Sequence, residues 1–269
     1  MLSISRIPPA LTTLAAATTL LMTMGVNAAS TTASPFPAYV HEALTVVAKR
    51  SHVPILGPMW LPDTQTMGRR LMPPGGTFAA TVHATPTRYQ IEFWVESHAL
   101  PVNSPDAIKD SKDAKPIAVI SGKQYLNTGG AAVAVHDNIA AWGPIPKSAE
   151  RVAITPTLSG ITWMPQTAGV EVEMIAWRER GWRIEADAFP VPNVRPVITA
   201  VAIARNLVPK VMASMPGQRG TLSISTSWRD DNGTATTAMW QRGKLVYAIF
   251  TPYGVSSATT VVSSLYPAR

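Results

Sequence analysis

The stretch Met174–Pro209 reads MIAWRERGWRIEADAFPVPNVRPVITAVAIARNLVP and decides the fold that the sequence predicts. The stretch reads as a strand, a tight turn at Arg180-Gly181 and a second strand. A proline-rich corner follows, and Asn193 then precedes a helical pattern with Pro196 in its first turn. The stretch therefore predicts a β-hairpin followed by an amphipathic helix.

The C-terminal part of the chain repeats this plan with the same landmark residues. In order, Trp177, Gly181 and Leu207-Val208-Pro209 correspond to Trp240, Gly243 and Leu265-Tyr266-Pro267. Two copies are too few for a solenoid, which needs three or more. They predict an α+β fold: one antiparallel sheet built from hairpin-plus-helix units, with the helices packed on one face. Glu179 has no counterpart in the second copy, so we interpret the unit as packing and expect the functional residues elsewhere.

A third hairpin is expected near the N-terminus, after a helix over Tyr39–Arg50. Phe78–Ala84 and Tyr89–Glu96 are apolar-rich runs that flank a Thr-Pro-Thr-Arg turn. In the second run Tyr89, Ile91, Phe93 and Val95 share one face, which predicts that this face is buried. The other face carries Trp94 among Gln and Glu residues, so it is expected to face water.

The N-terminus has the three parts of a secretory signal peptide: a basic start, the uncharged run Leu11–Met24, and small residues Val26 and Ala28 at the −3 and −1 positions of a signal-peptidase site. We therefore expect a signal peptide over 1–28, a linker over 29–37, and two α+β lobes over 38–146 and 147–269, the second holding both hairpin-plus-helix units. An uncleaved N-terminal anchor is the alternative. No later run is long enough to span a membrane, so no transmembrane span is expected after cleavage.

Composition narrows the classes of function. The chain has no cysteine, which excludes disulfides, thiol nucleophiles and cysteine-ligated metals, and suits a bacterial exterior. Only 14% of its 269 residues are charged, yet the net charge is +7. No Lys/Arg run is interleaved with aromatics, so nucleic acid is not an expected partner. An anionic cell wall or membrane surface fits this charge better.

No stretch supplies a catalytic, metal or cofactor signature, and none of these sites is expected. His83 and His98 flank the N-terminal hairpin, but the five histidines form no metal-binding motif. His136-Asp137 could supply a base and its orienting acid, but no Gly-x-Ser-x-Gly elbow accompanies them, and Ser121 is only part of a Ser-Gly turn. Other candidates are better explained as solvated faces, turns or packing. They are the acid pairs Glu92/Glu96 and Glu171/Glu173, the turn Asp230–Gly233, the glycines Gly129-Gly130 and the eight tryptophans. Among the tryptophans, Trp94 is the best candidate for an exposed binding residue.

The hairpin-plus-helix unit, together with Val53-Pro54 and Met59-Trp60-Leu61-Pro62, resembles a family of uncharacterised extracytoplasmic β-domains of Gram-positive bacteria, some of which are attached to anti-sigma or lipoprotein anchors. The resemblance covers about half of the chain and carries over no functional residue. It implies a secreted or surface-exposed domain. This chain departs from the family because it has no transmembrane anchor beyond the signal segment.

These observations predict a secreted, non-enzymatic binding protein or a protein associated with the cell surface, with an unknown ligand. The alternative is an extracytoplasmic hydrolase whose catalytic residues are brought together only by the fold.

Overall fold

A computed structural model describes residues 36–62, 76–112, 116–137, 145–165, 172–188, 199–211, 215, 219–225 and 235–268. All of them belong to one compact unit, Ser34–Arg269. The expected signal-peptidase site at Val26 and Ala28 and most of the expected linker lie outside these ranges.

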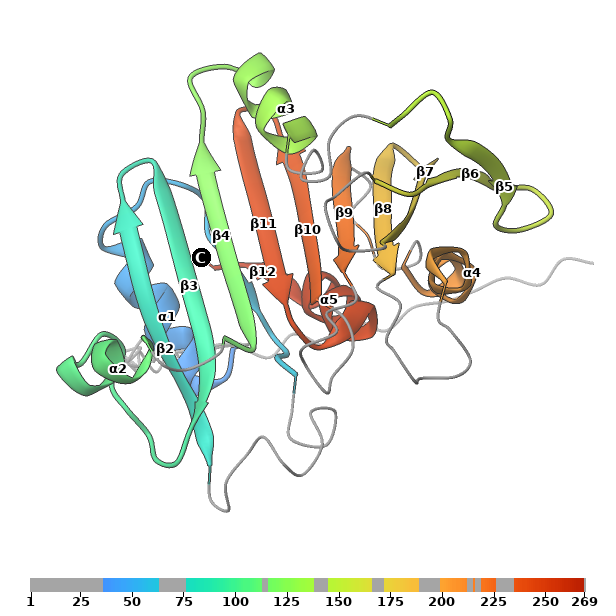
Figure 1. Ribbon diagram of the computed structural model, residues 1–269. Coiled ribbons are helices and arrows are strands. Elements are labelled where there is room, and N and C mark those ends of the chain that lie inside the picture. Colours follow the sequence, from blue (N-terminus) through green and yellow to red (C-terminus); the bar gives the residue numbers. More distant parts are fainter. Residues whose placement is uncertain are drawn as a thin grey trace, which may run out of the picture. The chain divides into compact units, whose positions relative to one another are not determined.

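Ten strands form one sheet in the order β2-β3-β4-β11-β10-β9-β8-β7-β6-β5 (Figure 1). Their bounds are β2 (Thr77–Thr85), β3 (Arg88–Glu96), β4 (Ala118–Gln124), β5 (Glu150–Ala153), β6 (Ser159–Trp163), β7 (Glu173–Glu179), β8 (Trp182–Ala188), β9 (Gly220–Ser225), β10 (Ala235–Arg242) and β11 (Leu245–Thr251). The helices are α1 (Ala38–Ala48), α2 (Pro105–Asp110), α3 (Thr128–Asp137), α4 (Ala200–Val211) and α5 (Gly254–Ser263). A separate antiparallel pair joins β1 (Leu56–Pro58) to β12 (Leu265–Pro267).

The three predicted hairpins are present as β2–β3, β7–β8 and β10–β11. At the β7–β8 turn Arg180 and Gly181 have φ angles of 48° and 86°. Two successive positive φ angles are typical of a turn whose twist matches that of the flanking strands. Glycine adopts a positive φ angle without strain, so Gly181 suits its position in the turn.

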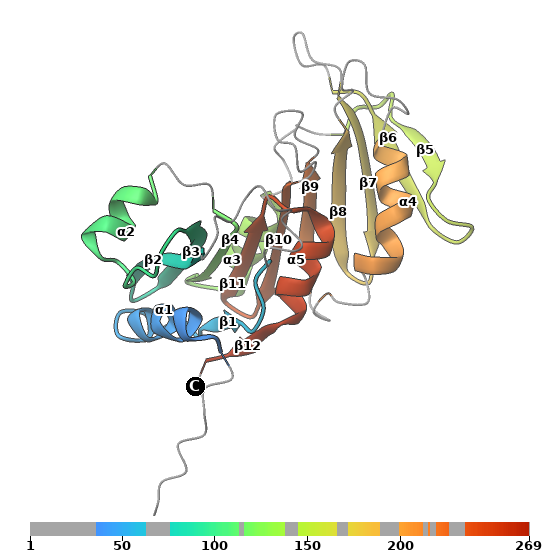
Figure 2. The ribbon, with the colours of Figure 1, turned by 90° about the horizontal axis from the view of Figure 1, so that it is seen from below.

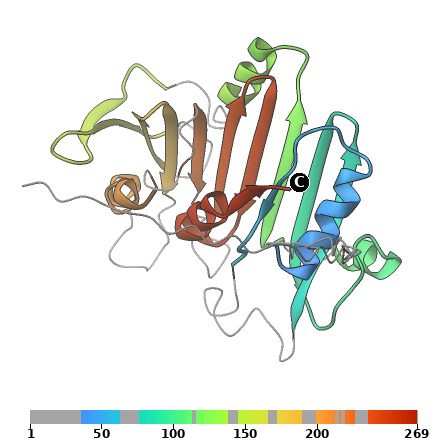
Figure 3. The same cartoon turned by 180° about the vertical axis from the view of Figure 1, so that it is seen from behind.

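One side of the sheet, which we call the core face, carries the main hydrophobic core. Ile91, Ile120, Leu222, Ile184 and Ile249 lie on it and are at most 1% exposed. Helices α1, α4 and α5 pack on this face, and Figure 3 shows α1 and α5 in front of the strands. Alternation along the strands puts the intervening residues on the opposite side, the outer face.

The outer face is covered in part by the two remaining helices. Ala107 of α2 packs on Ala79 and Trp94, and Figure 2 shows α2 on the other side of the strands from α1. Ala131 and Val135 of α3 pack on Val246 of β11. Both helices occupy outer-face positions that would otherwise face water.

The predicted fold class is therefore wrong in three respects. Strand accounts for 44% of the structure and helix for 25%, so the protein is richer in β-structure than an α+β fold with a helical layer. The sheet is mixed, because β8 and β9 pair in parallel. Helices also lie on both faces.

The parallel pair has a simple physical origin. Parallel neighbours need a crossover connection, and α4 supplies it between β8 and β9. The sequence interpretation treated that helix as the end of one antiparallel unit, so it missed the crossover. Strands from both expected lobes, 38–146 and 147–269, share the sheet, since β4 pairs with β11.

Candidate functional site

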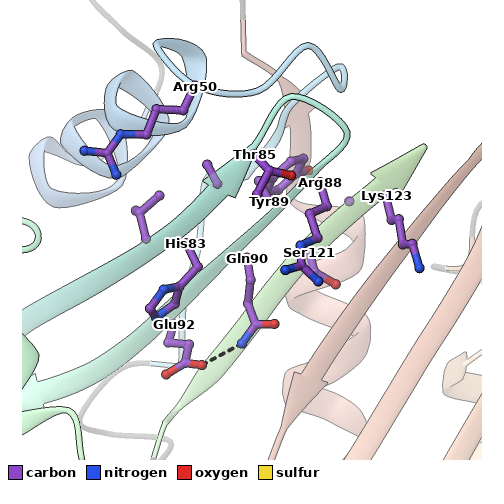
Figure 4. Close-up of a pocket in the computed structure, with 12 residues that line it drawn as sticks. Arg50, His83, Thr85, Arg88, Tyr89, Gln90, Glu92, Ser121 and Lys123 are labelled. Carbon is purple, nitrogen blue, oxygen red and sulfur yellow. Dashed lines mark hydrogen bonds between the residues drawn. The ribbon is translucent and has the colours of Figure 1, made fainter. Parts of the chain in front are cut away.

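Cavities open among the described residues, and a smaller one lies on β2, β3 and β4. We call it the His83 groove; it encloses about 660 Å³, and its outer-face side chains include His83, Gln90, Glu92, Ser121 and Lys123 (Figure 4). Gln90 Nε2 donates a hydrogen bond to Glu92 Oε1 at 2.6 Å. His83 pairs with Gln90 and Gln90 with Ser121, so a whole strand separates the histidine from the serine. Two strand spacings are about 9.5 Å, which is beyond hydrogen-bond reach.

The larger cavity, which we call the Arg183 pocket, encloses about 1150 Å³. Arg151 of β5, Arg178 of β7 and Arg183 of β8 line it, together with His136 of α3. Arg178 and Arg183 are directly opposite each other in the β7–β8 register. The pocket thus collects three guanidinium groups from three strands.

Glu185 is the acidic residue that accompanies these arginines. Its Oε1 accepts a hydrogen bond from Arg183 Nη2 at 2.5 Å, and the two side chains are 6% and 20% exposed. Burial raises the pKa of Glu185 above its ordinary value, while Arg183 and then His136 lower it in part. Burial is the largest of these effects, so the Glu185 carboxyl is harder to ionise here than in water even beside Arg183.

The Arg183 pocket also has apolar lining residues. Ile145 and Ile161 line it and keep 37% and 40% of their surface exposed. Beneath them Trp163, Met174 and Ala176 form a small buried cluster on the outer face. The pocket therefore offers cations beside accessible apolar surface, an arrangement suited to an anion that carries an apolar part.

The histidines that the sequence singled out are not brought together. His83 is paired near the β2–β3 turn, whereas His98 lies beyond the other end of β3 and contacts Ser97 at 3.1 Å. His136 Nδ1 and Asp137 Oδ1 are 3.4 Å apart, but both side chains are about two-thirds exposed. Within the described ranges no group of three or more His, Asp or Glu residues is placed to hold a metal.

The acidic candidates are engaged in local hydrogen bonds. Glu96 Oε1 accepts from Trp94 Nε1 at 2.9 Å, and Glu92 accepts from Gln90. Glu173 Oε2 accepts from the backbone N–H of Ala200 at 3.0 Å, at the start of α4. Four further candidates lie outside the described residues: Glu171, the turn Asp230–Gly233, Trp142 and Trp228.

The expectation that Trp94 is exposed is wrong. Trp94 is 1% exposed, because Ala107 of α2 packs over it. The alternation in β3 correctly places it on the outer face, but the sequence pattern does not show that a helix covers this part of that face. Trp177, Trp182 and Trp240 are likewise buried, in the main core.

Sequence reasoning missed Arg178, Arg183 and Glu185 as a functional group. It noted the crowded turn but assigned the hairpin to packing, which is true of Trp177 and Trp182 on the core face. The alternation Trp-Arg-x-x-Gly-Trp-Arg-Ile-Glu already puts the charged residues on the opposite face. The missing information was that the outer face of β7 and β8 borders a cavity.

Ser121 and the Gly129-Gly130 pair take structural positions. Ser121 lies inside β4 and not in a turn, and Gly130 donates its backbone N–H to Asn127 Oδ1 at 2.8 Å in the first turn of α3.

None of the helices in the described ranges combines the length and apolar character that crossing a bilayer requires. No protein-family model matches the chain, and neither a curated protein nor a solved structure is detectably similar to it.

Proposed function

We propose that the protein is a binding protein that acts outside the cytoplasmic membrane and holds an anionic amphiphile in the Arg183 pocket without reacting with it. The observation that supports this most directly is the meeting of Arg151, Arg178 and Arg183 at one cavity that also has apolar lining residues. The signal-peptide pattern over 1–28 supports the location.

The cross-strand arginine pair argues for an anionic ligand. Like charges directly opposite each other destabilise a sheet. Arg178 and Arg183 occupy such opposite positions, and Glu185 is hydrogen-bonded to Arg183. An anionic group bound between the guanidinium groups removes this repulsion and accepts charge-assisted hydrogen bonds.

The strand register argues for an apolar part in the ligand. Ile161 of β6 pairs with Arg151 of β5 on one side and with Ala176 of β7 on the other. An apolar strip therefore runs between Arg151 and the strand that carries Arg178. The cavity, at about 1150 Å³, is slightly above the 300–1,000 Å³ range of typical ligand pockets. A single-chain amphiphile, with its headgroup at Arg178 and Arg183 and its chain along Ile161 and Ile145, fits both features.

Isothermal titration calorimetry with octyl phosphate below its micelle concentration tests the proposal. Octyl glucoside supplies the same chain without the charge, and inorganic phosphate supplies the charge without the chain. We expect octyl phosphate to bind more tightly than either, because only octyl phosphate can contact both the arginines and the apolar residues of the pocket. Arg178→Gln should weaken its binding about tenfold or more, the effect of losing a charge-assisted hydrogen bond.

Arg88→Gln is the matched control, because Arg88 lines the His83 groove and lies outside the Arg183 pocket. It should leave the affinity for octyl phosphate unchanged. Equal binding of octyl phosphate and octyl glucoside, or equal losses in the two variants, would show that the Arg183 pocket does not select an anionic amphiphile.

A further inference from the structure

One end of the sheet gathers several turns. Backbone hydrogen bonds connect them: Gln124 N–H donates to Thr87 O at 2.8 Å, and Tyr125 N–H donates to Lys244 O at 2.9 Å. The β2–β3 turn, the end of β4, the start of α3 and the β10–β11 turn therefore lie together, and Figure 1 shows α3 at this end. We call it the turn end; α2 contacts the sheet near the opposite end, beside Ala79 and Trp94.

The turn end is basic. Six exposed cations border it: Arg50, Arg88, Lys123, Arg219, Arg242 and Lys244. The segments 49–52, 85–88, 121–127, 219–220 and 241–245 contain no aspartate or glutamate, while the β7–β8 turn beside Arg219 adds Glu179 and Arg180. Arg50, Arg88 and Lys123 also line the His83 groove, so a polar recess opens beside these cations.

The same end carries an exposed apolar tip. Leu126 is 94% exposed and lies two residues before Thr128, where α3 begins. Val133 on the outward side of α3 is 58% exposed. Tyr125 is held under Lys123, whose Nζ lies 4.6 Å from the ring centroid. Single exposed apolar residues are ordinary, but here an almost fully exposed leucine lies at the same end of the sheet as six cations.

We propose that the turn end docks on an anionic lipid bilayer, with Leu126 entering the boundary between headgroups and acyl chains and the six cations facing lipid phosphates. An apolar residue at the interface combined with basic residues around it is how peripheral proteins bind anionic membranes. This surface adjoins the Arg183 pocket through α3, which contributes His136 to that pocket, but the proposal does not depend on the ligand proposed for it.

Leu126 also decides between the two anionic surfaces that the composition suggested. A hydrated wall polymer attracts the six cations but offers no apolar phase for a leucine side chain. A bilayer offers both. The bilayer therefore accounts for the cations and for the exposed leucine together.

Flotation of the compact unit Ser34–Arg269 with lipid vesicles tests the proposal. Vesicles of phosphatidylcholine with 30% phosphatidylglycerol should carry the protein at 0.1 M salt, and phosphatidylcholine vesicles should not. Leu126→Ser should lower the partition coefficient about tenfold, as expected for a leucine that no longer leaves water. Lys123→Gln with Lys244→Gln should lower it by about fivefold for each charge removed.

The control substitutions lie on α2 and in the turn directly after it, near the opposite end of the sheet. Ile108 is 47% exposed, so Ile108→Ser removes a comparable apolar side chain, and Lys109→Gln with Lys112→Gln removes two comparable charges. Both controls should float like the wild type. Circular dichroism spectra confirm that each variant is folded.

Two results would overturn the bilayer proposal. The first is unchanged flotation of Leu126→Ser. The second is equally tight binding of wild type and Leu126→Ser to soluble polyglycerol phosphate together with no flotation on anionic vesicles, which assigns the turn end to a wall polymer.

Discussion

At the scale of single residues, Glu185 controls the electrostatics of the Arg183 pocket. It is the acid that forms a hydrogen bond with one of the three arginines, and it is 5% exposed on β8. A carboxylate in this position occupies a guanidinium group that an anionic ligand would otherwise use. Glu185 therefore acts as an internal competitor of the ligand.

The raised pKa of Glu185 makes a prediction about pH and stability. A group with a higher pKa in the folded state than in the unfolded state stabilises the fold below its unfolded pKa, and this contribution is lost as pH rises through the folded value. The free energy of unfolding of the wild type, relative to Glu185→Gln, should therefore fall between pH 4 and pH 8. Urea titrations of both proteins across this range measure it. A difference that stays flat or rises with pH would contradict the desolvated environment of Glu185.

Tyr89 of β3 connects the sheet to the earlier segment around Leu56. Its hydroxyl oxygen accepts a hydrogen bond from the backbone N–H of Leu56 at 3.1 Å, and the side chain is 2% exposed. Tyr89→Phe leaves that N–H without its partner, so we expect a loss of about 1–2 kcal/mol in the free energy of unfolding. Tyr125→Phe is the control, because its ring contacts Lys123 through the π face. Equal stabilities of the two variants would show that the Tyr89 hydroxyl does not anchor Leu56.

At the scale of elements, Gly220 marks the point where β9 lies between its parallel neighbour β8 and its antiparallel neighbour β10. A Cβ atom at Gly220 would lie 2.6 Å from the Trp182 ring and 2.7 Å from the backbone oxygen of Met239. At Gly243 a Cβ atom would meet nothing within 4 Å, but the φ angle is 63°. The two glycines are therefore required for different reasons.

Gly220→Ala should destabilise the protein by about 1–3 kcal/mol, because backbone cannot move aside as a flexible side chain can. Gly243→Ala should cost about 1 kcal/mol, the strain of a left-handed residue with a Cβ atom. Chemical denaturation of both variants measures the difference. A smaller loss for Gly220→Ala than for Gly243→Ala would contradict the close packing of Trp182 against β9.

The elements also show what local sequence patterns can predict. The hairpins at Thr85–Arg88, Arg180-Gly181 and Gly243 followed from turn residues and alternation, which act between near neighbours. The parallel pairing of β8 with β9 depends on where the chain returns after α4, and alternation is the same for parallel and antiparallel neighbours. The sequence therefore predicted the strands but not the mixed sheet.

The candidate site was harder to predict for the same reason. Alternation places Arg178 and Arg183 opposite Trp177 and Trp182, and this much was readable. The pocket also needs Arg151 and His136, which lie on other elements and are joined only by the sheet order and by α3. For Trp94 the face of the sheet was predicted correctly, but the helix that covers this face, α2, was not.

At the scale of the whole molecule, one core links strands from both halves of the chain. Ile91 and Ile120 share it with Ile184, Leu222 and Ile249, and β4 pairs directly with β11. We therefore expect the unit Ser34–Arg269 to unfold in one cooperative transition. Tryptophan fluorescence and far-ultraviolet circular dichroism should give the same urea midpoint. Two separated midpoints would show that the parts of the sheet unfold independently.

The most direct test of the central claim, that the Arg183 pocket binds an anionic amphiphile, compares Glu185→Gln with Arg183→Gln in one calorimetric titration with octyl phosphate. Removing the competing carboxylate should tighten binding, whereas removing the guanidinium group should weaken it about tenfold or more. The account predicts these opposite signs because Glu185 and the ligand share Arg183. Weaker binding in both variants, or no change in either, would contradict it.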